Sequence, residues 1–184
     1  VLYENYDMDK REAEDLLDFV AMATVCDVMS LTGENRILVK EGLKRIRHTK
    51  NIGLQALMQA CNVQPENISA YHFGYVLGPC VNATGRLDTA RHALRLFETG
   101  QETEAEEIAR DLVDLNQERK ELTLQGVEMA KKLCEEGGYE NDPVLVLFLP
   151  DVHESIAGLI AGRIREMYNR PVFVLTRGEE GVKG

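Results

Sequence analysis

The chain has 184 residues, of which 44% are hydrophobic, which is enough for one sizeable core or two small ones. Its longest uncharged runs reach about eight residues, and a membrane-spanning helix needs roughly twenty, so we expect no membrane partner. No export signal is recognisable, and the four cysteines have no spacing typical of zinc sites. We therefore expect a cytoplasmic protein with free thiols at Cys26, Cys61, Cys80 and Cys134.

The net charge of −10 argues, taken alone, against a nucleic-acid partner. The charge is unevenly distributed, however. The segment from Glu98 to Asp142 holds fourteen acidic and five basic residues, whereas Arg36 to Lys50 holds six basic residues and one acid. A chain of this kind can bind a phosphate backbone on one face. The basic stretch is either a solvated helical face or a contact for a polyanion.

The N-terminal part is predicted to be helical. Apolar residues at steps of three and four predict a helix from Asp9 to about Met29, and the apolar run inside it places this helix in a core. A second helix is predicted at residues 34–48, and two more at residues 53–61 and 66–75. Gly78-Pro79 and Gly85 indicate a loop over residues 77–86. Asp88 or Thr89 is expected to cap a helix that runs to Glu98.

The segment from Glu102 to Glu136 is predicted to be one long helix. Ile108, Leu115, Leu122 and Met129 fall seven residues apart and form a seam like that of a coiled coil. Arg119 and Gly126 interrupt the seam. A helix of this length usually connects two domains, so we expect the domain boundary within or beside it.

The pattern changes after residue 138 and predicts a β-α-β unit, with strands at 144–149 and 171–176 and a helix at 155–168. A right-handed parallel crossover is expected. Gly158 and Gly162 predict close packing of this helix. Residues 177–184 are expected to form a turn whose return strand is missing, and both ends suggest an internal fragment. The predicted fold is mostly α with a small α/β part.

Three places along the chain carry candidate functional residues. Asp27 falls on the apolar stripe of the first helix, where a buried carboxylate must cap a neighbouring backbone group, pair with Arg36 or bind a divalent cation. Asn82 and Arg86 belong to a segment that either cradles a phosphate ahead of a helix or forms a capped turn, with Arg86 paired to an acid. His153 follows the first strand, where ligands of α/β units gather, although a surface histidine is the plainer interpretation.

Four segments together resemble the RecJ-like members of the DHH phosphoesterase family. They are residues 23–36 (ATVCDVMSLTGENR), 77–87 (LGPCVNATGRL), 115–120 (LNQERK) and 152–163 (VHESIAGLIAGR), and they occur in the order and spacing of the family. The first resembles a metal-binding motif, the third the interdomain helix and the fourth the opening of the DHHA1 domain. The chain departs from the family at Val152, where tryptophan is common, and at residues 155–157.

The resemblance implies three regions: residues 1–100 as the C-terminal part of a DHH domain with a helical extension, 101–138 as the connecting helix and 139–184 as a truncated start of DHHA1. It implies a 5′-to-3′ exonuclease for single-stranded DNA that acts in repair and recombination, possesses two Mn²⁺ or Mg²⁺ ions, and has other repair proteins as candidate partners. By position, Asp27 would be a metal ligand, and Asn82, Arg86 and His153 would contact substrate. A fragment with one carboxylate ligand is expected to be inactive.

Two other functions remain open on the sequence alone. A DHH phosphodiesterase for short oligonucleotides or signalling dinucleotides would share the metal motif but should lack the long linking helix. A helical interaction or scaffold module would use the acidic long helix as its partner surface, and it predicts self-association through Ile108, Leu115 and Leu122.

Overall fold

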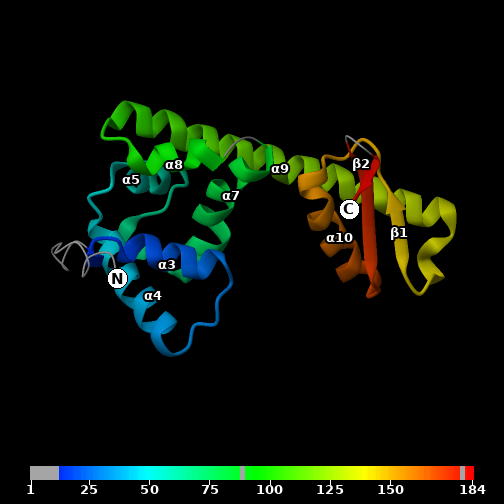
Figure 1. Cartoon of the computed structure of the whole chain (residues 1–184), viewed down its shortest axis with the longest axis horizontal. Coiled ribbons are helices and arrows are strands. Elements are labelled where there is room, and N and C mark those ends of the chain that lie inside the picture. The colour runs from blue at the N-terminus through cyan, green and yellow to red at the C-terminus, as the bar shows by residue number, and fades with distance from the viewer. Residues whose placement is uncertain (1–12, 88–89, 179–180) are drawn as a thin grey trace. The chain divides into compact units, whose positions relative to one another are not determined.

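The computed structural model describes residues 13–87, 90–178 and 181–184, which divide into two compact units (Figure 1). The first unit ends at Asn116 and the second begins at Gln117, so the division falls inside one helix. The first unit is helical and the second contains a small sheet, which confirms the predicted fold class. Among the described residues, no helix combines the length and the apolar character needed to cross a bilayer.

Two helices, α3 (Leu17–Cys26) and α4 (Gly33–Arg45), pack side by side in the first unit (Figure 1). Their contact is closest at Gly42, where a Cβ atom would collide with the carbonyl oxygen of Leu17 and the side chain of Ala21. The predicted start of the first helix, at Asp9, lies outside the described residues. The predicted helix at residues 34–48 is confirmed as α4 followed by a short 3₁₀ turn, η1 (Ile46–His48).

The prediction of which face of α3 is buried is wrong. The buried residues are Asp18, Ala21 and Met22, whereas Leu16 and Ala23, on the predicted apolar stripe, are exposed. Asp18 is tolerated inside because its two carboxylate oxygens are bonded: Thr49 Oγ1 donates to Oδ2 at 2.7 Å, and the backbone N–H of Phe19 donates to Oδ1 at 2.7 Å. A hydrogen-bonded carboxylate can replace an apolar residue in a core.

A short helix, α5 (Ile52–Ala60), packs against α8 (Ala90–Glu98). Asn51 joins the two: its Oδ1 accepts from the N–H of Leu54 at 2.9 Å and so caps α5, while its Nδ2 donates to the carbonyl of Phe97 at 2.8 Å. The cap predicted at Asp88 or Thr89 for α8 lies outside the described residues.

The loop predicted over residues 77–86 is wrong, because these residues are helical. After the 3₁₀ turn η2 (Pro65–Asn67), the chain continues without a break through α6 (Ala70–His72), the π-helical turn η3 (Phe73–Leu77) and α7 (Gly78–Leu87). The N–H of Gly78 bonds to the carbonyl of Phe73, five residues back. This wider turn accommodates Pro79, which has no N–H and whose ring would clash with a carbonyl in a regular helix.

The long helix is confirmed as α9 (Glu102–Gly137). It contributes to both cores: Ala105, Ile108 and Leu112 are buried in the first unit, and Val127, Ala130 and Cys134 in the second. Of the predicted seam, Ile108 is buried, Leu115 and Leu122 are half-buried, and Met129 is exposed. Most of the seam therefore packs within its own unit, which leaves little of it for self-association.

The second unit contains the predicted β-α-β arrangement. Strands β1 (Leu145–Phe148) and β2 (Val172–Gly178) are parallel, in a register that pairs Leu145 with Val172, and α10 (Glu154–Tyr168) connects them. A 3₁₀ turn, η4 (Tyr139–Asn141), precedes β1. A third strand, β3 (Gly181–Lys183), runs antiparallel to β2. The return strand that the sequence analysis expected to be missing is thus present.

The prediction of close packing at Gly158 and Gly162 is also wrong, since a Cβ at either position would meet open space. The buried face of α10 is instead made by Ile156, Ile160 and Ile164. The close approach occurs at Gly126 of α9, where a Cβ would collide with Cδ1 of Ile160.

The contact at Gly42 gives a direct test of the α3–α4 packing. We expect Gly42→Ala to lower the free energy of unfolding of the first unit by about 2 kcal/mol, because the added methyl meets a backbone oxygen that cannot move aside. Gly85→Ala is the matched control, since its Cβ would lie in open space on α7 and should stabilise by about 0.5 kcal/mol. Urea unfolding measures both. Equal stability of the two variants would contradict the packing described.

Candidate functional site

Asp27 lies at the C-terminal end of α3 and is exposed. The predictions that it is buried and that it pairs with Arg36 are therefore wrong for this chain: with the residues that the structure describes, it forms neither an ion pair nor a side-chain hydrogen bond. Its backbone N–H donates to the carbonyl of Ala23 at 2.9 Å, so the helical hydrogen bonding continues up to Asp27. The carboxylate itself is available to a ligand.

The backbone directly after Asp27 adopts an unusual conformation. Val28 has a φ of 56°, in the left-handed region. The N–H of Val28 donates to the carbonyl of Val25 at 3.0 Å, and the N–H of Met29 donates to the carbonyl of Thr24 at 3.1 Å. This is the Schellman arrangement, in which glycine usually occupies the position of Val28. A β-branched residue is strained there by roughly 1–2 kcal/mol. The strain lies next to the one carboxylate that the sequence singles out.

Cys26 ties the end of α3 to the start of α7. Its Sγ donates to the carbonyl of Phe73 at 3.4 Å, and it lies so close to Gly78 that a Cβ there would collide with the sulfur. Burial raises the pKa of the Cys26 thiol, and the charge of Asp27 raises it further. Asp27 is therefore held beside the N-terminal end of α7.

Helix α7 carries the other two candidates of the first unit. Asn82 is exposed, and Arg86 follows four residues later, so the two positions share one helical face. The side chain of Arg86, and with it the expected pairing to an acid, lies outside the described parts of the chain. Because residues 82–86 are inside a helix, their N–H groups point back along it to carbonyl partners. The predicted phosphate cradle of free N–H groups at this segment is thus wrong.

His153 lies in the second unit, between β1 and α10, as the sequence indicated. It is the N-cap of α10: its Nδ1 accepts from the N–H of Ser155 at 3.3 Å and lies 2.6 Å from Ser155 Oγ. The neutral ring that makes this bond carries its proton on Nε2, a tautomer inferred from the hydrogen bonds. The exposed ring thus offers a donor. The spacing of His153 and Ser155 before a helix was the signal for this capping role.

The described residues do not build a metal centre by themselves. They contain no group of three or more His, Cys, Asp or Glu side chains placed to hold an ion. Mg²⁺ and Mn²⁺ are held by about six oxygen-rich ligands, so Asp27 could supply only one of the set.

A basic groove of about 490 Å³ lies along α4. The sequence left open whether this basic stretch is a solvated helical face or a contact for a polyanion. It is lined by three apolar residues, Leu31, Val39 and Leu43, and by four cations, Arg36, Lys40, Lys44 and Arg47. Lys44 pairs with Glu41 at 2.7 Å on the surface. Several cations along one groove suit the phosphates of a nucleic-acid strand.

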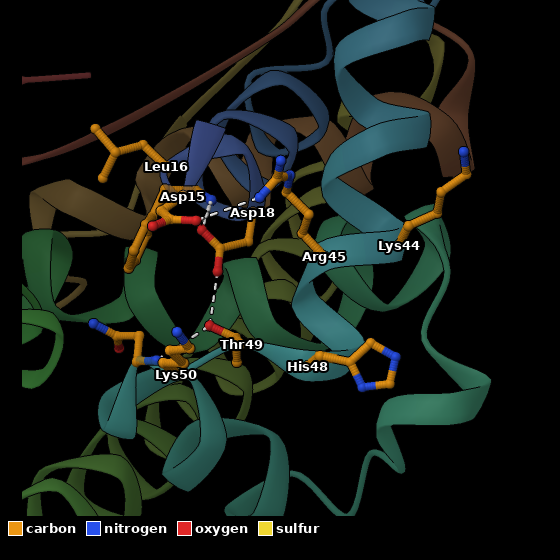
Figure 2. A pocket seen from close by; sticks show the side chains of 10 residues that line it. Asp15, Leu16, Asp18, Lys44, Arg45, His48, Thr49 and Lys50 are labelled. Atoms are coloured by element: carbon orange, nitrogen blue, oxygen red, sulfur yellow. Dashed lines mark hydrogen bonds and ion pairs between the residues drawn. The ribbon is translucent and has the colours of Figure 1, made fainter. Parts of the chain in front are cut away.

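A second cavity, of about 540 Å³, lies at the N-terminal end of α3, the end away from Asp27 (Figure 2). Figure 2 shows Asp18 and Thr49 pointing toward each other across it, with Arg45 turned to Asp15. Arg45 also contacts Glu14, with 2.5 Å between Nη2 and Oε2. Nine residues of helix, a rise of roughly 13 Å, separate Asp18 from Asp27. Its two acids and Arg45 are already engaged with protein partners, so we assign the cavity no ligand.

The sequence matches no family model, but it is similar to curated proteins named single-stranded-DNA-specific exonuclease RecJ. It is 36% identical to that of Haemophilus influenzae in an alignment of 173 positions that covers 91% of this chain and 30% of the relative. It is 37% identical to that of Escherichia coli over 91% of the chain, and 36% identical to that of Thermus thermophilus over 90%. The chain spans about 30% of the length of the first two relatives.

The structure agrees with solved RecJ structures. It superposes on RecJ of Thermus thermophilus in complex with Mg²⁺ with a TM-score of 0.83 and 34% identity, over 96% of this chain and 27% of that one. A manganese-bound exonuclease RecJ gives the same TM-score at 33% identity and 44% coverage of its chain. The fold is thus that of a RecJ segment. The chain corresponds, in sequence and in fold, to one part of a RecJ protein.

The strain at Val28 leads to a test of the backbone beside Asp27. We expect Val28→Gly to raise the free energy of unfolding by about 1 kcal/mol, because glycine adopts a positive φ without steric cost. Val28→Ala, which keeps a Cβ but loses the branch, should gain less. Chemical unfolding of the three proteins measures the series. A loss of stability in the glycine variant would show that the Val28 side chain is needed where it lies.

Proposed function

We propose that this chain is part of a metal-dependent 5′-to-3′ exonuclease that degrades single-stranded DNA in repair and recombination in the cytoplasm. The observation that carries the proposal is the match to RecJ, which extends over 91% of the chain in sequence and 96% in fold. The relatives are named single-stranded-DNA-specific exonucleases, and the solved neighbours hold Mg²⁺ or Mn²⁺. In this proposal the chain corresponds to the end of a DHH domain (1–100), a connecting helix (101–138) and the start of a DHHA1 domain (139–184).

Asp27 is the proposed metal ligand of this segment. The surface around it is apolar and open: Val28 is 88% exposed, Met29 52% and Leu31 39%. A patch of this kind on a soluble protein marks a contact surface. Since the relatives are about three times as long as the matched segment, we infer that another part of the protein covers this patch and brings the remaining metal ligands to Asp27.

The substrate-side proposal assigns Asn82, Arg86 and His153 to contacts with the DNA strand. Asn82 is exposed on α7, whose first turn contacts the helix end that carries Asp27, so both residues belong to one region of the first unit. His153 presents a ring N–H that can donate to a phosphate oxygen. The groove on α4 adds a row of cations for the sugar-phosphate backbone.

The metal proposal is tested in the longer protein that contains this segment. We expect Asp27→Asn to reduce the rate of nucleotide release from single-stranded DNA at least about a hundredfold in Mn²⁺, because a direct ligand matters more than the outer-shell groups whose loss costs 10–100-fold. Asp114→Asn, at an exposed position on α9, is the control and should retain activity. The 184-residue chain alone should release nothing. Full activity of the Asp27 variant would remove Asp27 from the site.

The same assay separates this proposal from a phosphodiesterase for short substrates. Strands of several tens of nucleotides, labelled at the 5′ or the 3′ end, should be shortened from the 5′ end. Rapid cleavage of dinucleotides with long strands left intact would favour the phosphodiesterase instead.

His153 has a capping role and a proposed binding role, and one pair of variants separates them. Asparagine at this position can still accept from the N–H of Ser155, so His153→Asn should preserve thermal stability, whereas His153→Ala should lose about 1 kcal/mol. In the longer protein, both variants should weaken the binding of single-stranded DNA about tenfold, as the loss of one hydrogen bond to a charged group implies. Unchanged affinity in His153→Asn would leave His153 a cap and nothing more.

A further inference from the structure

Two cysteines that the proposed nuclease function does not use lie in direct contact. The Sγ atoms of Cys61 and Cys80 are 3.8 Å apart, although nineteen positions separate the two residues in the chain. Cys61 is the C-cap of α5, and Cys80 lies in the first turn of α7. Each helix end is fixed by its own backbone hydrogen bonds, so the contact is built into the fold.

The two cysteines differ in their exposure and in their contacts. Cys80 is only 3% exposed, whereas Cys61 is half-buried and can be reached by a small solute. The Cys80 sulfur accepts a hydrogen bond from Asn116 Nδ2 at 3.5 Å, and it donates to the carbonyl of Val76 at 3.3 Å. These two contacts hold the Cys80 sulfur in position beside that of Cys61.

We propose that Cys61 and Cys80 are a redox site, which forms a reversible intramolecular disulfide when the protein meets a peroxide. In the first step, the accessible Cys61 sulfur attacks one peroxide oxygen: an S–O bond forms, the O–O bond breaks, and the other oxygen leaves as water, giving a sulfenic acid. In the second step, the Cys80 sulfur attacks the Cys61 sulfur. The S–S bond forms, the S–O bond breaks, and the hydroxide takes the proton of Cys80 as a second water.

The other two cysteines lack this combination. Cys134 is fully buried in the second unit. Cys26 is half-buried, and its Sγ contacts the carbonyl of Phe73 rather than a second sulfur. The expected oxidation is therefore selective for the Cys61–Cys80 pair.

The bond would change the fold locally. An S–S bond is about 2.05 Å long, so the sulfurs must approach by nearly 2 Å, which draws the start of α7 toward the end of α5. The cross-link would also close a loop of about twenty residues, and such loops contribute stability by restricting the unfolded chain.

The test is to treat the chain with hydrogen peroxide at micromolar protein concentration and to count free thiols after denaturation. Four thiols should fall to two, and peptide mapping should find residues 61 and 80 in one linked pair, which dithiothreitol separates. The oxidised protein should unfold at a temperature roughly 5–10 °C higher than the reduced one.

Cys26→Ser is the matched control and should still lose two thiols, whereas Cys61→Ser should form no intramolecular disulfide. The mapping of the unmodified chain decides the matter even if a variant folds poorly. Four surviving thiols, a link that involves Cys26 or Cys134, or a thiol loss that grows with protein concentration would each overturn the proposal.

Discussion

The arrangement of the first unit depends on a single change of hydrogen-bond register ahead of Pro79. In a regular helix this proline would leave a carbonyl unpaired and collide with it, so the chain would turn away. The π-helical turn at Phe73–Leu77 avoids the collision and lets the chain continue directly into α7. The position of α7 then determines three other features: the contact of Gly78 with Cys26, the contact of Cys80 with Cys61, and the exposed position of Asn82.

This register change also explains the largest error of prediction from the sequence. Gly78-Pro79 is a strong signal of a chain break, and the compensating turn leaves no comparable trace in local composition. Elements with a long and regular pattern were predicted well, as in α4, α9 and the β-α-β unit. A local pattern cannot report what a face packs against, however. For this reason the buried face of α3 was assigned to the stripe of Asp27, and the bonded carboxylate of Asp18 was missed.

For the candidate site, too, the sequence and the fold supplied different information. The motifs identified which residues to examine, and the fold then showed what each side chain contacts. Asp27 is open to a ligand at a strained helix end, and His153 combines a cap with an outward N–H. The groove on α4 could not be read from the sequence, because a row of basic residues at helical spacing is equally typical of a solvated surface. The groove that these residues line together with Leu31, Val39 and Leu43 appears only in the fold.

Gly42 and Gly126 both allow a close approach, yet they constrain sequence divergence to different degrees. At Gly42 the obstacle includes the main chain of the neighbouring helix, which has no rotamer to change. At Gly126 the nearest obstacle is the terminal methyl of Ile160, which can rotate about its own side-chain bonds. Position 42 should therefore stay glycine among diverging sequences, whereas position 126 can drift to alanine when residue 160 becomes smaller. The α3–α4 pair is the less adaptable of these two contacts.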